Sequence, residues 1–268
     1  MLLSLAVSVL LSAPPAVVVD CQYADDIALG ARWVEVLVSD GSELVVMETE
    51  VTRSQWTAVM GRAPEPWSCR EGSCPVTGLT PFDMMAFANR VSEIEGLDRC
   101  YDFDACVAPF DGSIECGHVP RLEPGCAGFR LPTYAELLLL MYRRYGLDAD
   151  YGWKIPREAR ASLLATGWLA ENSSGVTHSV AQRLASALGL FDLVGNVSEV
   201  VVDPVPMTPN ADGLSPWALD ASRVGTVGGN YTSEMSLRDP GARGAAIVEI
   251  PSHTAGLRLM RTFGGSTP

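Results

Sequence analysis

Two carboxylates in the second half of the chain bracket a glycine turn and could bind a hard cation. Asp192 and Glu199 are seven residues apart, and Gly195 and Asn196 form the turn between them. Ca²⁺ is coordinated by carboxylate and carbonyl oxygens, so carbonyl groups of such a turn can complete a shell begun by the two side chains. The spacing is not that of an EF-hand, and an ordinary loop with an asparagine-containing turn is the alternative interpretation.

Seven cysteines provide a second possible chemistry, and six of them are clustered. These six are Cys69, Cys74, Cys100, Cys106, Cys116 and Cys126. In an exported protein such clustering predicts disulfides, and Cys69 with Cys74, which would close a short loop, form the best single pair. The spacing does not fix the other pairings. A zinc site that includes His118, two residues after Cys116, is the alternative, although zinc sites normally have closer cysteine or histidine partners.

No catalytic nucleophile or phosphate-binding loop can be recognised from the residues alone. The three histidines are scattered at positions 118, 178 and 253, and no Gly-x-Ser-x-Gly elbow is present. Residues 225–229 are glycine-rich but lack the strand, loop and helix that a phosphate-binding loop needs. The sequence therefore predicts no catalytic residue.

The composition excludes two broad classes of protein. The chain has 268 residues, with 19 Lys and Arg against 32 Asp and Glu, for a net charge of −13. Nucleic-acid phosphates are bound by clustered basic side chains, so no nucleic-acid partner is expected. A hydrophobic content of 47% supplies a core that disordered chains lack, and 25 glycines with 18 prolines favour a loop-rich globule over a helical bundle.

The first residues are typical of an export signal. Residues 2–19 carry no charge, the apolar run 2–11 fits a signal-peptide core, and small residues at 12–16 offer a cleavage site. The sequence thus predicts a signal peptide over residues 1–20 and a mature protein in the periplasm, the cell envelope or the extracellular space. The run is short for a membrane span and is followed by two prolines, so no transmembrane span is expected in the mature chain. A buried first strand is the alternative.

Turn and cap signals locate the elements of the first half. Runs 33–38 and 44–51 are rich in β-formers and flank a Ser-Asp-Gly turn, which predicts a hairpin. Thr52, Thr80 and Thr133 can each cap the start of a helix, because a threonine oxygen can accept an otherwise unpaired backbone N–H. In two of the three, the residue three positions later can also reach back to the cap.

The rest of the chain predicts one α+β domain over residues 25–263. The helix that begins at Thr133 contains Leu137–Met141, which is apolar on all sides, so we expect it to be buried at the centre. Few helix patterns follow residue 147, where short strands at 197–202 and 255–260 are joined by long loops. Loops of this length are usually functional or are held in place by ions.

Six segments in order resemble one family, the sulfatase-modifying-factor or formylglycine-generating-enzyme domain, over residues 44–260. They are Glu50-Val-Thr52 with Gln55-Trp56; Cys74-Pro-Val76 with Asp83, Ala86 and Asn89; Gly128–Glu136; Asn172–Val180 with Gly189–Glu199; Val227–Tyr231; and Ala255–Leu259. The resemblance implies a C-type-lectin-like variant with little regular secondary structure that is often stabilised by calcium. The implied calcium ligands are the side chains of Asp192 and Glu199 and the carbonyls of Gly195 and Val197.

Catalytic members of the family oxidise a cysteine of a sulfatase to formylglycine with a copper-binding cysteine pair. The matching positions here are Ser233 and Arg238, and no cysteine follows Cys126. Thiolates are the ligands that hold soft Cu(I), so copper is not expected and the protein is predicted to be a pseudoenzyme. The alternative is an oxidase of the same type, acting on a protein cysteine with non-standard metal ligands.

These observations predict an exported, calcium-stabilised recognition or structural module with an unknown protein or glycan ligand. Candidate ligand contacts are Tyr231, Glu234, Arg238 and Arg243, because loops on such a scaffold can present a binding surface. A structural subunit of the cell envelope that binds no ligand of its own is a third possibility.

Overall fold

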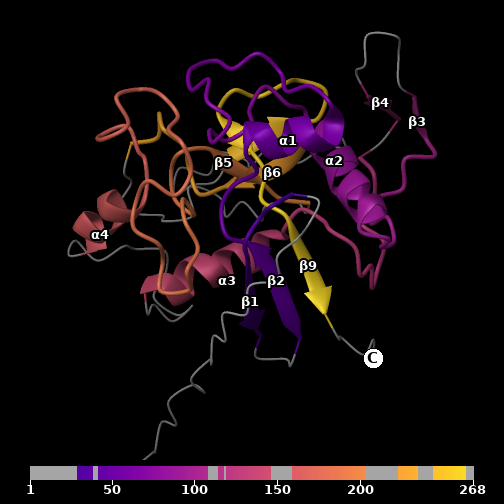
Figure 1. Ribbon diagram of the computed structural model, residues 1–268, viewed down its shortest axis with the longest axis horizontal. Coiled ribbons are helices and arrows are strands. Elements are labelled where there is room, and N and C mark those ends of the chain that lie inside the picture. Colours follow the sequence, from indigo (N-terminus) through magenta and orange to yellow (C-terminus); the bar gives the residue numbers. More distant parts are fainter. Residues whose placement is uncertain are drawn as a thin grey trace, which may run out of the picture.

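The computed structural model describes residues 29–38, 42–107, 114–117, 119–145, 159–202, 223–234 and 244–263 (Figure 1). The predicted signal peptide lies outside these residues, as do Cys21, His118, Arg238 and Arg243. Short helices and strands joined by long loops confirm the expected α+β fold with little regular structure. No helix in the described ranges is long and apolar enough to cross a membrane.

The first sheet joins the beginning of the described chain to its end. It contains β1 (Trp33–Leu37), β2 (Glu43–Met47) and β9 (Met260–Phe263) in the antiparallel order β1-β2-β9. The predicted hairpin is confirmed by the register in which Trp33 lies opposite Met47. Figure 1 shows this sheet below the rest of the molecule.

A second sheet lies on the other side of the molecule and carries the site described below. Its strands are β5 (Ser198–Val200), β6 (Arg223–Val227), β7 (Gly244–Ile247) and β8 (Ala255–Gly256). The order is β7-β6-β5-β8, with β5 and β8 parallel and the other neighbours antiparallel. Consequently β7 is an edge strand.

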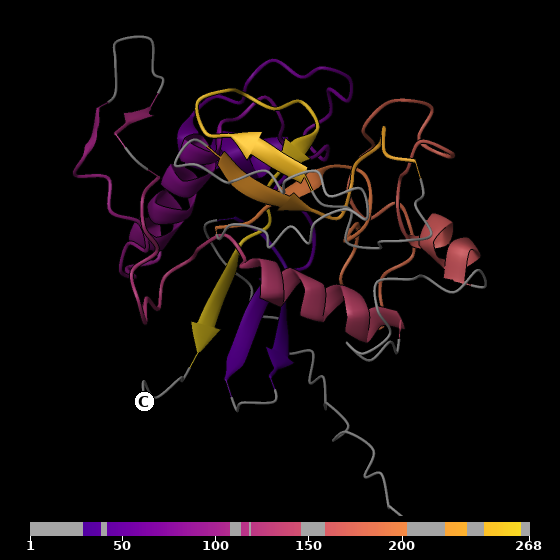
Figure 2. The same cartoon turned by 180° about the vertical axis from the view of Figure 1, so that it is seen from behind.

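A third, two-stranded sheet forms an arm that projects from the body in both views (Figures 1 and 2). It pairs β3 (Cys106–Val107) with β4 (Glu115–Cys116) in antiparallel register.

Four helices complete the fold: α1 (Arg53–Met60), α2 (Pro81–Ile94), α3 (Tyr134–Tyr145) and α4 (Ala159–Thr166). The three predicted threonine caps are confirmed, and all three are reciprocal: Gln55, Asp83 and Glu136 each reach back to the cap backbone. Helix α4 was not predicted, although its alanines and leucines are good helix formers.

Helix α3 crosses the middle of the molecule between the two larger sheets (Figure 2). Leu137, Leu140 and Met141 are buried in a core cluster that also contains Val34 of β1. The neighbouring Leu138 is only partly buried. The expected burial of this apolar run at the centre is thus confirmed for Leu137, Leu140 and Met141, whereas Leu138 and Leu139 are covered only in part.

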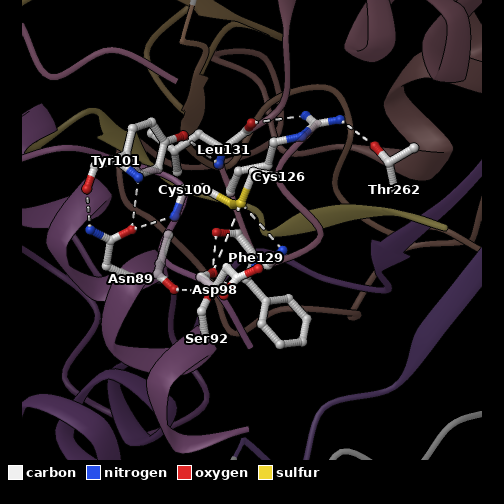
Figure 3. Close-up of a disulfide and its surroundings, with 12 residues drawn as sticks. Asn89, Ser92, Asp98, Cys100, Tyr101, Cys126, Phe129, Leu131 and Thr262 are labelled. Atoms are coloured by element: carbon white, nitrogen blue, oxygen red, sulfur yellow. Dashed lines mark hydrogen bonds between the residues drawn. A yellow bond between two sulfur atoms is a disulfide. The ribbon is translucent and has the colours of Figure 1, made fainter. Parts of the chain in front are cut away.

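Three disulfides use all six clustered cysteines: Cys69–Cys74, Cys100–Cys126 and Cys106–Cys116. The first was predicted, and the others settle what the spacing left open. The zinc alternative is wrong, since these thiols are consumed. Figure 3 shows how Cys100–Cys126 joins the segment after α2 to the segment before α3. The buried Asn89 side chain accepts from the amides of Cys100 and Tyr101 at 2.9 and 3.0 Å.

Candidate functional site

Four charged side chains from distant parts of the chain meet at the centre of the molecule. They are Glu50, which precedes α1, Asp192 in the loop before β5, Glu199 of β5 and Arg258 between β8 and β9, and all four are buried. A buried charge is strongly unfavourable unless it is paired and hydrogen-bonded. Their partners therefore decide what this cluster, here called the ionic cluster, can do.

Arg258 is the cation of the ionic cluster. Its Nε and Nη2 atoms donate to Oε1 of Glu199 at 2.9 and 2.7 Å. The same guanidinium donates to the carbonyl oxygens of Met47, Glu48 and Phe191 at 2.7–2.9 Å. Burial alone would lower the pKa of Arg258, but the charge of Glu199 raises it. This one side chain thus joins the end of β2, the loop before β5, and β5 itself.

Glu50 holds the turn before β5 from the opposite side. Its Oε1 accepts from the amide of Val197 at 3.0 Å, and its Oε2 accepts from Nδ2 of Asn196 at 2.7 Å. Burial raises the pKa of Glu50 well above its ordinary value, and the negative charges of Asp192 and Glu199 act in the same direction. Glu50 therefore lies within the electric field of both Asp192 and Glu199.

The ionic cluster contains more negative than positive charge. Within the described part of the chain, Arg258 is the cation that acts on Glu50, against the two carboxylates of Asp192 and Glu199. Oε2 of Glu199 is buried and has no hydrogen-bond partner among the described residues. An unpartnered carboxylate oxygen beside excess negative charge is what a bound divalent cation would complement, so the donor chemistry fits Ca²⁺.

Three of the four predicted calcium ligands, Asp192, Gly195 and Val197, lie in the loop before β5, and Glu199 lies in β5, with the charges of Asp192 and Glu199 both acting on Glu50. Asp192 accepts from the amide of Ala181 through Oδ2 at 2.8 Å, so that oxygen already has one partner. No group of three or more His, Cys, Asp or Glu side chains in the described ranges is arranged to hold a metal ion. A calcium ion here would therefore depend on the carbonyls of Gly195 and Val197 as well as on side chains.

Gly195 is required by the close approach of two segments. Its φ is +85°, and a Cβ atom there would overlap the backbone of Trp168. The amide of Asn196 donates to the carbonyl oxygen of Trp168 at 2.7 Å, which keeps the segments together. Only glycine combines this backbone angle with this contact.

We expect Gly195→Ala to lower the free energy of unfolding by more than about 2 kcal/mol, because backbone strain adds to a steric clash. Gly175→Ala is the matched control, since Gly175 has a φ of +75° but nothing within 4 Å of an added Cβ. Its cost should be limited to the backbone term, about 1 kcal/mol. Urea unfolding measures both, and equal losses would contradict the close approach.

The other face of the second sheet has a polar groove of about 210 Å³. It is lined by hydroxyls, an amide and small residues: Ser198, Thr226, Gly229, Asn230, Ser233, Gly244, Ala245, Ala246, Ser252, Thr254 and Ala255. The groove contains no charged side chain from the described residues. Ser233, which takes the position expected for the first copper-binding cysteine, lines this groove. We call it the hydroxyl groove.

The predicted ligand contacts are only partly placed. Tyr231 is buried, its amide donates to the carbonyl of Asn196 at 3.0 Å, and its own carbonyl accepts from Ser173 Oγ at 2.7 Å. These bonds give Tyr231 a role in supporting the turn. Glu234 is exposed, and Arg238 and Arg243 lie outside the described residues.

Glu50 and Arg258 were not predicted to belong to the site. Arg258 is the one charged residue of the apolar run 255–260, and a single charge in a run that becomes buried needs a partner, which is a signal that identifies this position. Glu50 shares the run 44–51 with Glu48, so the sequence marks it less clearly.

Comparison with known proteins identifies the family to which this architecture belongs. The family model of the sulfatase-modifying factor enzyme 1-like domain matches residues 32–263. The chain belongs to this family. The resemblance inferred from its six segments is therefore confirmed, and the ionic cluster and the hydroxyl groove are features of a sulfatase-modifying-factor domain.

Relatives of this domain include proteins with different names. The chaperone protein LppX of Paenibacillus barcinonensis is 27% identical over 241 residues, which cover 82% of this chain and 81% of LppX. Treponema denticola variable protein 1 superposes with a TM-score of 0.67 at 25% identity, covering 92% of this chain and 93% of that one. CarF superposes with a TM-score of 0.60 at 22% identity, covering 83% and 87%.

Proposed function

We propose that this protein is a non-catalytic recognition module of the sulfatase-modifying-factor family that works outside the cytoplasm. The observation that carries the proposal is the pairing of all six clustered cysteines in disulfides. A disulfide sulfur is not the thiolate that Cu(I) needs. Cys69 and Cys74 have the spacing of the family's copper pair, but their bond to each other makes them a structural bridge.

The hydroxyl groove supports binding in place of oxidation. Ser233 lines it where the family oxidases carry the first cysteine of their copper pair, and it accepts from the amide of Asn230 at 3.0 Å. Hydroxyl and amide groups in a concave site fix the orientation of a ligand without reacting with it. The similarity to LppX, which is named a chaperone protein, favours a protein ligand over a glycan.

The proposed location outside the cytoplasm rests on two observations. Three disulfides are typical of proteins from oxidising compartments. Residues 1–20 have the composition of a signal peptide.

A direct assay tests the absence of oxidase activity. The disulfide-intact protein is incubated with Cu(I), oxygen, a reductant and a cysteine peptide of the sulfatase type, with a catalytic family member as positive control. We expect no aldehyde product and no bound copper at one ion per chain by mass spectrometry. Stoichiometric copper together with aldehyde would establish the alternative, an oxidase with non-standard metal ligands.

The recognition role has its own test. Thr254 lines the hydroxyl groove, whereas Thr232 is exposed and does not line it. Partners captured from the native envelope fraction by the wild-type protein should be lost with Thr254→Arg and kept with Thr232→Arg. If both variants capture the same partners as the wild type, binding does not take place in the groove.

We also propose that calcium stabilises the folded state at the ionic cluster, with Asp192 and Glu199 as side-chain ligands and the carbonyls of Gly195 and Val197 completing the shell. An ion that binds only the native state at about 100 times its dissociation constant contributes about 2.7 kcal/mol. For a domain of this size that corresponds to a melting temperature about 5–10 °C higher. A calcium chelator should therefore lower the melting temperature, and excess Ca²⁺ should restore it.

Glu199→Gln is the informative variant, because it keeps an oxygen for Arg258 while removing the charge. We expect this variant to melt at the same temperature with and without chelator. A wild-type protein that is equally insensitive would show that no calcium binds here.

A further inference from the structure

A groove of about 600 Å³ lies beside the β3–β4 arm, outside the ionic cluster and the hydroxyl groove. Its lining residues come from the arm, from the start of α2 and from the turn after β7: Thr80, Ala105, Val107, Ile114, Glu115, Cys116, Gly117 and Glu249. We call it the arm groove. Its volume lies in the range of ordinary ligand-binding clefts.

Aliphatic side chains lie in and beside the arm groove. Val107 of β3 is 63% exposed and lines it together with the partly buried Ile114. The turn that carries Glu249 begins and ends with Ile247 and Ile250, which are 37% and 55% exposed but do not line the groove. Exposed apolar groups at a groove can mark an interaction surface.

The charged side chains of the described residues that line the arm groove are all negative. Glu115 and Glu249 are exposed and line it, and no Lys or Arg of the described residues lines it. Neither carboxylate forms a salt bridge with a described residue. A partner that fits must therefore be positive as well as aliphatic, and the net charge of −13 would steer such a partner toward the protein.

The arm also presents backbone groups. In the described residues β3 pairs only with β4, so each strand has a second edge that is not covered by another strand. An extended peptide can add to such an edge through its main chain while its side chains enter neighbouring pockets. The disulfide between the directly opposed Cys106 and Cys116 cross-links β3 to β4. The arm surface is therefore held in place before a ligand binds.

We propose that the arm groove binds an extended peptide segment of a partner protein in which basic and aliphatic residues alternate along one face of the strand. The basic side chains face Glu115 and Glu249, and the aliphatic ones contact Val107, which lies opposite Glu115 in the arm, and Ile114. This site is separate from the hydroxyl groove, so it stands whether or not the function proposed above is correct.

Fluorescence anisotropy with the full, disulfide-intact protein tests the proposal. The probe is a fluorescein-labelled octapeptide in which leucine and arginine alternate at every second position, with serine between them, so that both kinds of side chain lie on one face of the strand. Glu115→Gln with Glu249→Gln should weaken its binding about tenfold, from two exposed charge pairs. The matched control, Glu35→Gln with Glu43→Gln, removes the same charge from the first sheet, at the far side of the molecule (Figure 2). It should change binding less than about twofold.

A second pair of measurements separates a built site from simple charge attraction. Val107→Ser should weaken binding of the leucine–arginine peptide about fivefold, because an apolar contact is lost. The same variant should bind a peptide with serine in place of leucine as well as the wild type does. An alternating leucine–glutamate peptide should not bind. Equal weakening by the two double variants, or equal affinity for the leucine and serine peptides, would overturn the proposal.

Discussion

Arg258→Met should cost about 3–5 kcal/mol of unfolding free energy, because it leaves buried carboxylates without their cation. Arg258 is completely buried and makes hydrogen bonds to Glu199 and to three backbone carbonyls. Methionine fills a similar volume but can replace none of these bonds. In a domain of this size the loss corresponds to a melting temperature lower by about 10 °C.

Arg90→Met is the matched control for this prediction. Arg90 pairs with Glu93 at 2.9 Å on the surface of α2, and its side chain is about half exposed. A pair of this kind typically contributes less than about 1 kcal/mol. Urea unfolding of the disulfide-intact proteins measures both variants. An Arg258→Met variant that is no less stable than Arg90→Met would mean that Glu199 is neutralised by something other than Arg258.

Cys100→Ala with Cys126→Ala should destabilise the protein by about 3.5 kcal/mol, more than loss of either other disulfide. The bond closes the longest of the three loops, with a sequence separation of 26, and the entropy removed from the unfolded chain grows with loop length. It also holds the segment in which the amide of Leu131 donates to the hydroxyl of Tyr101 at 2.9 Å (Figure 3).

Cys69→Ala with Cys74→Ala is the comparison, because its sequence separation is 5, for which loop entropy gives about 2 kcal/mol. Urea unfolding of both double variants checks the order. If the shorter loop costs more, contacts in the native state outweigh the entropy of the unfolded chain.

Local interactions were the part of the fold that could be predicted. Thr52, Thr80 and Thr133 form their caps with residues three positions away, so the sequence contains both partners side by side. The short Cys69–Cys74 bridge was predictable for the same reason. The longer disulfides were not, since several pairings satisfy the same spacing.

The ionic cluster depends on contacts between residues that are far apart in the chain. Glu50 meets Asn196 across 146 positions, and Arg258 meets Glu199 across 59. No local pattern links Glu50 and Arg258 to the cluster, whereas the spacing of Asp192 and Glu199 around a glycine turn drew attention to those two residues. Helix α4 was missed because it has no cap signal comparable to the three threonines.

The pairing of β2 with β9 has a consequence for biosynthesis. Glu43 lies opposite Phe263, so the middle strand of the first sheet cannot gain its second neighbour until the last strand has emerged from the ribosome. Contacts of such long range slow folding and leave an uncovered strand edge in the nascent chain. The first sheet of this polypeptide is therefore completed only near the end of synthesis.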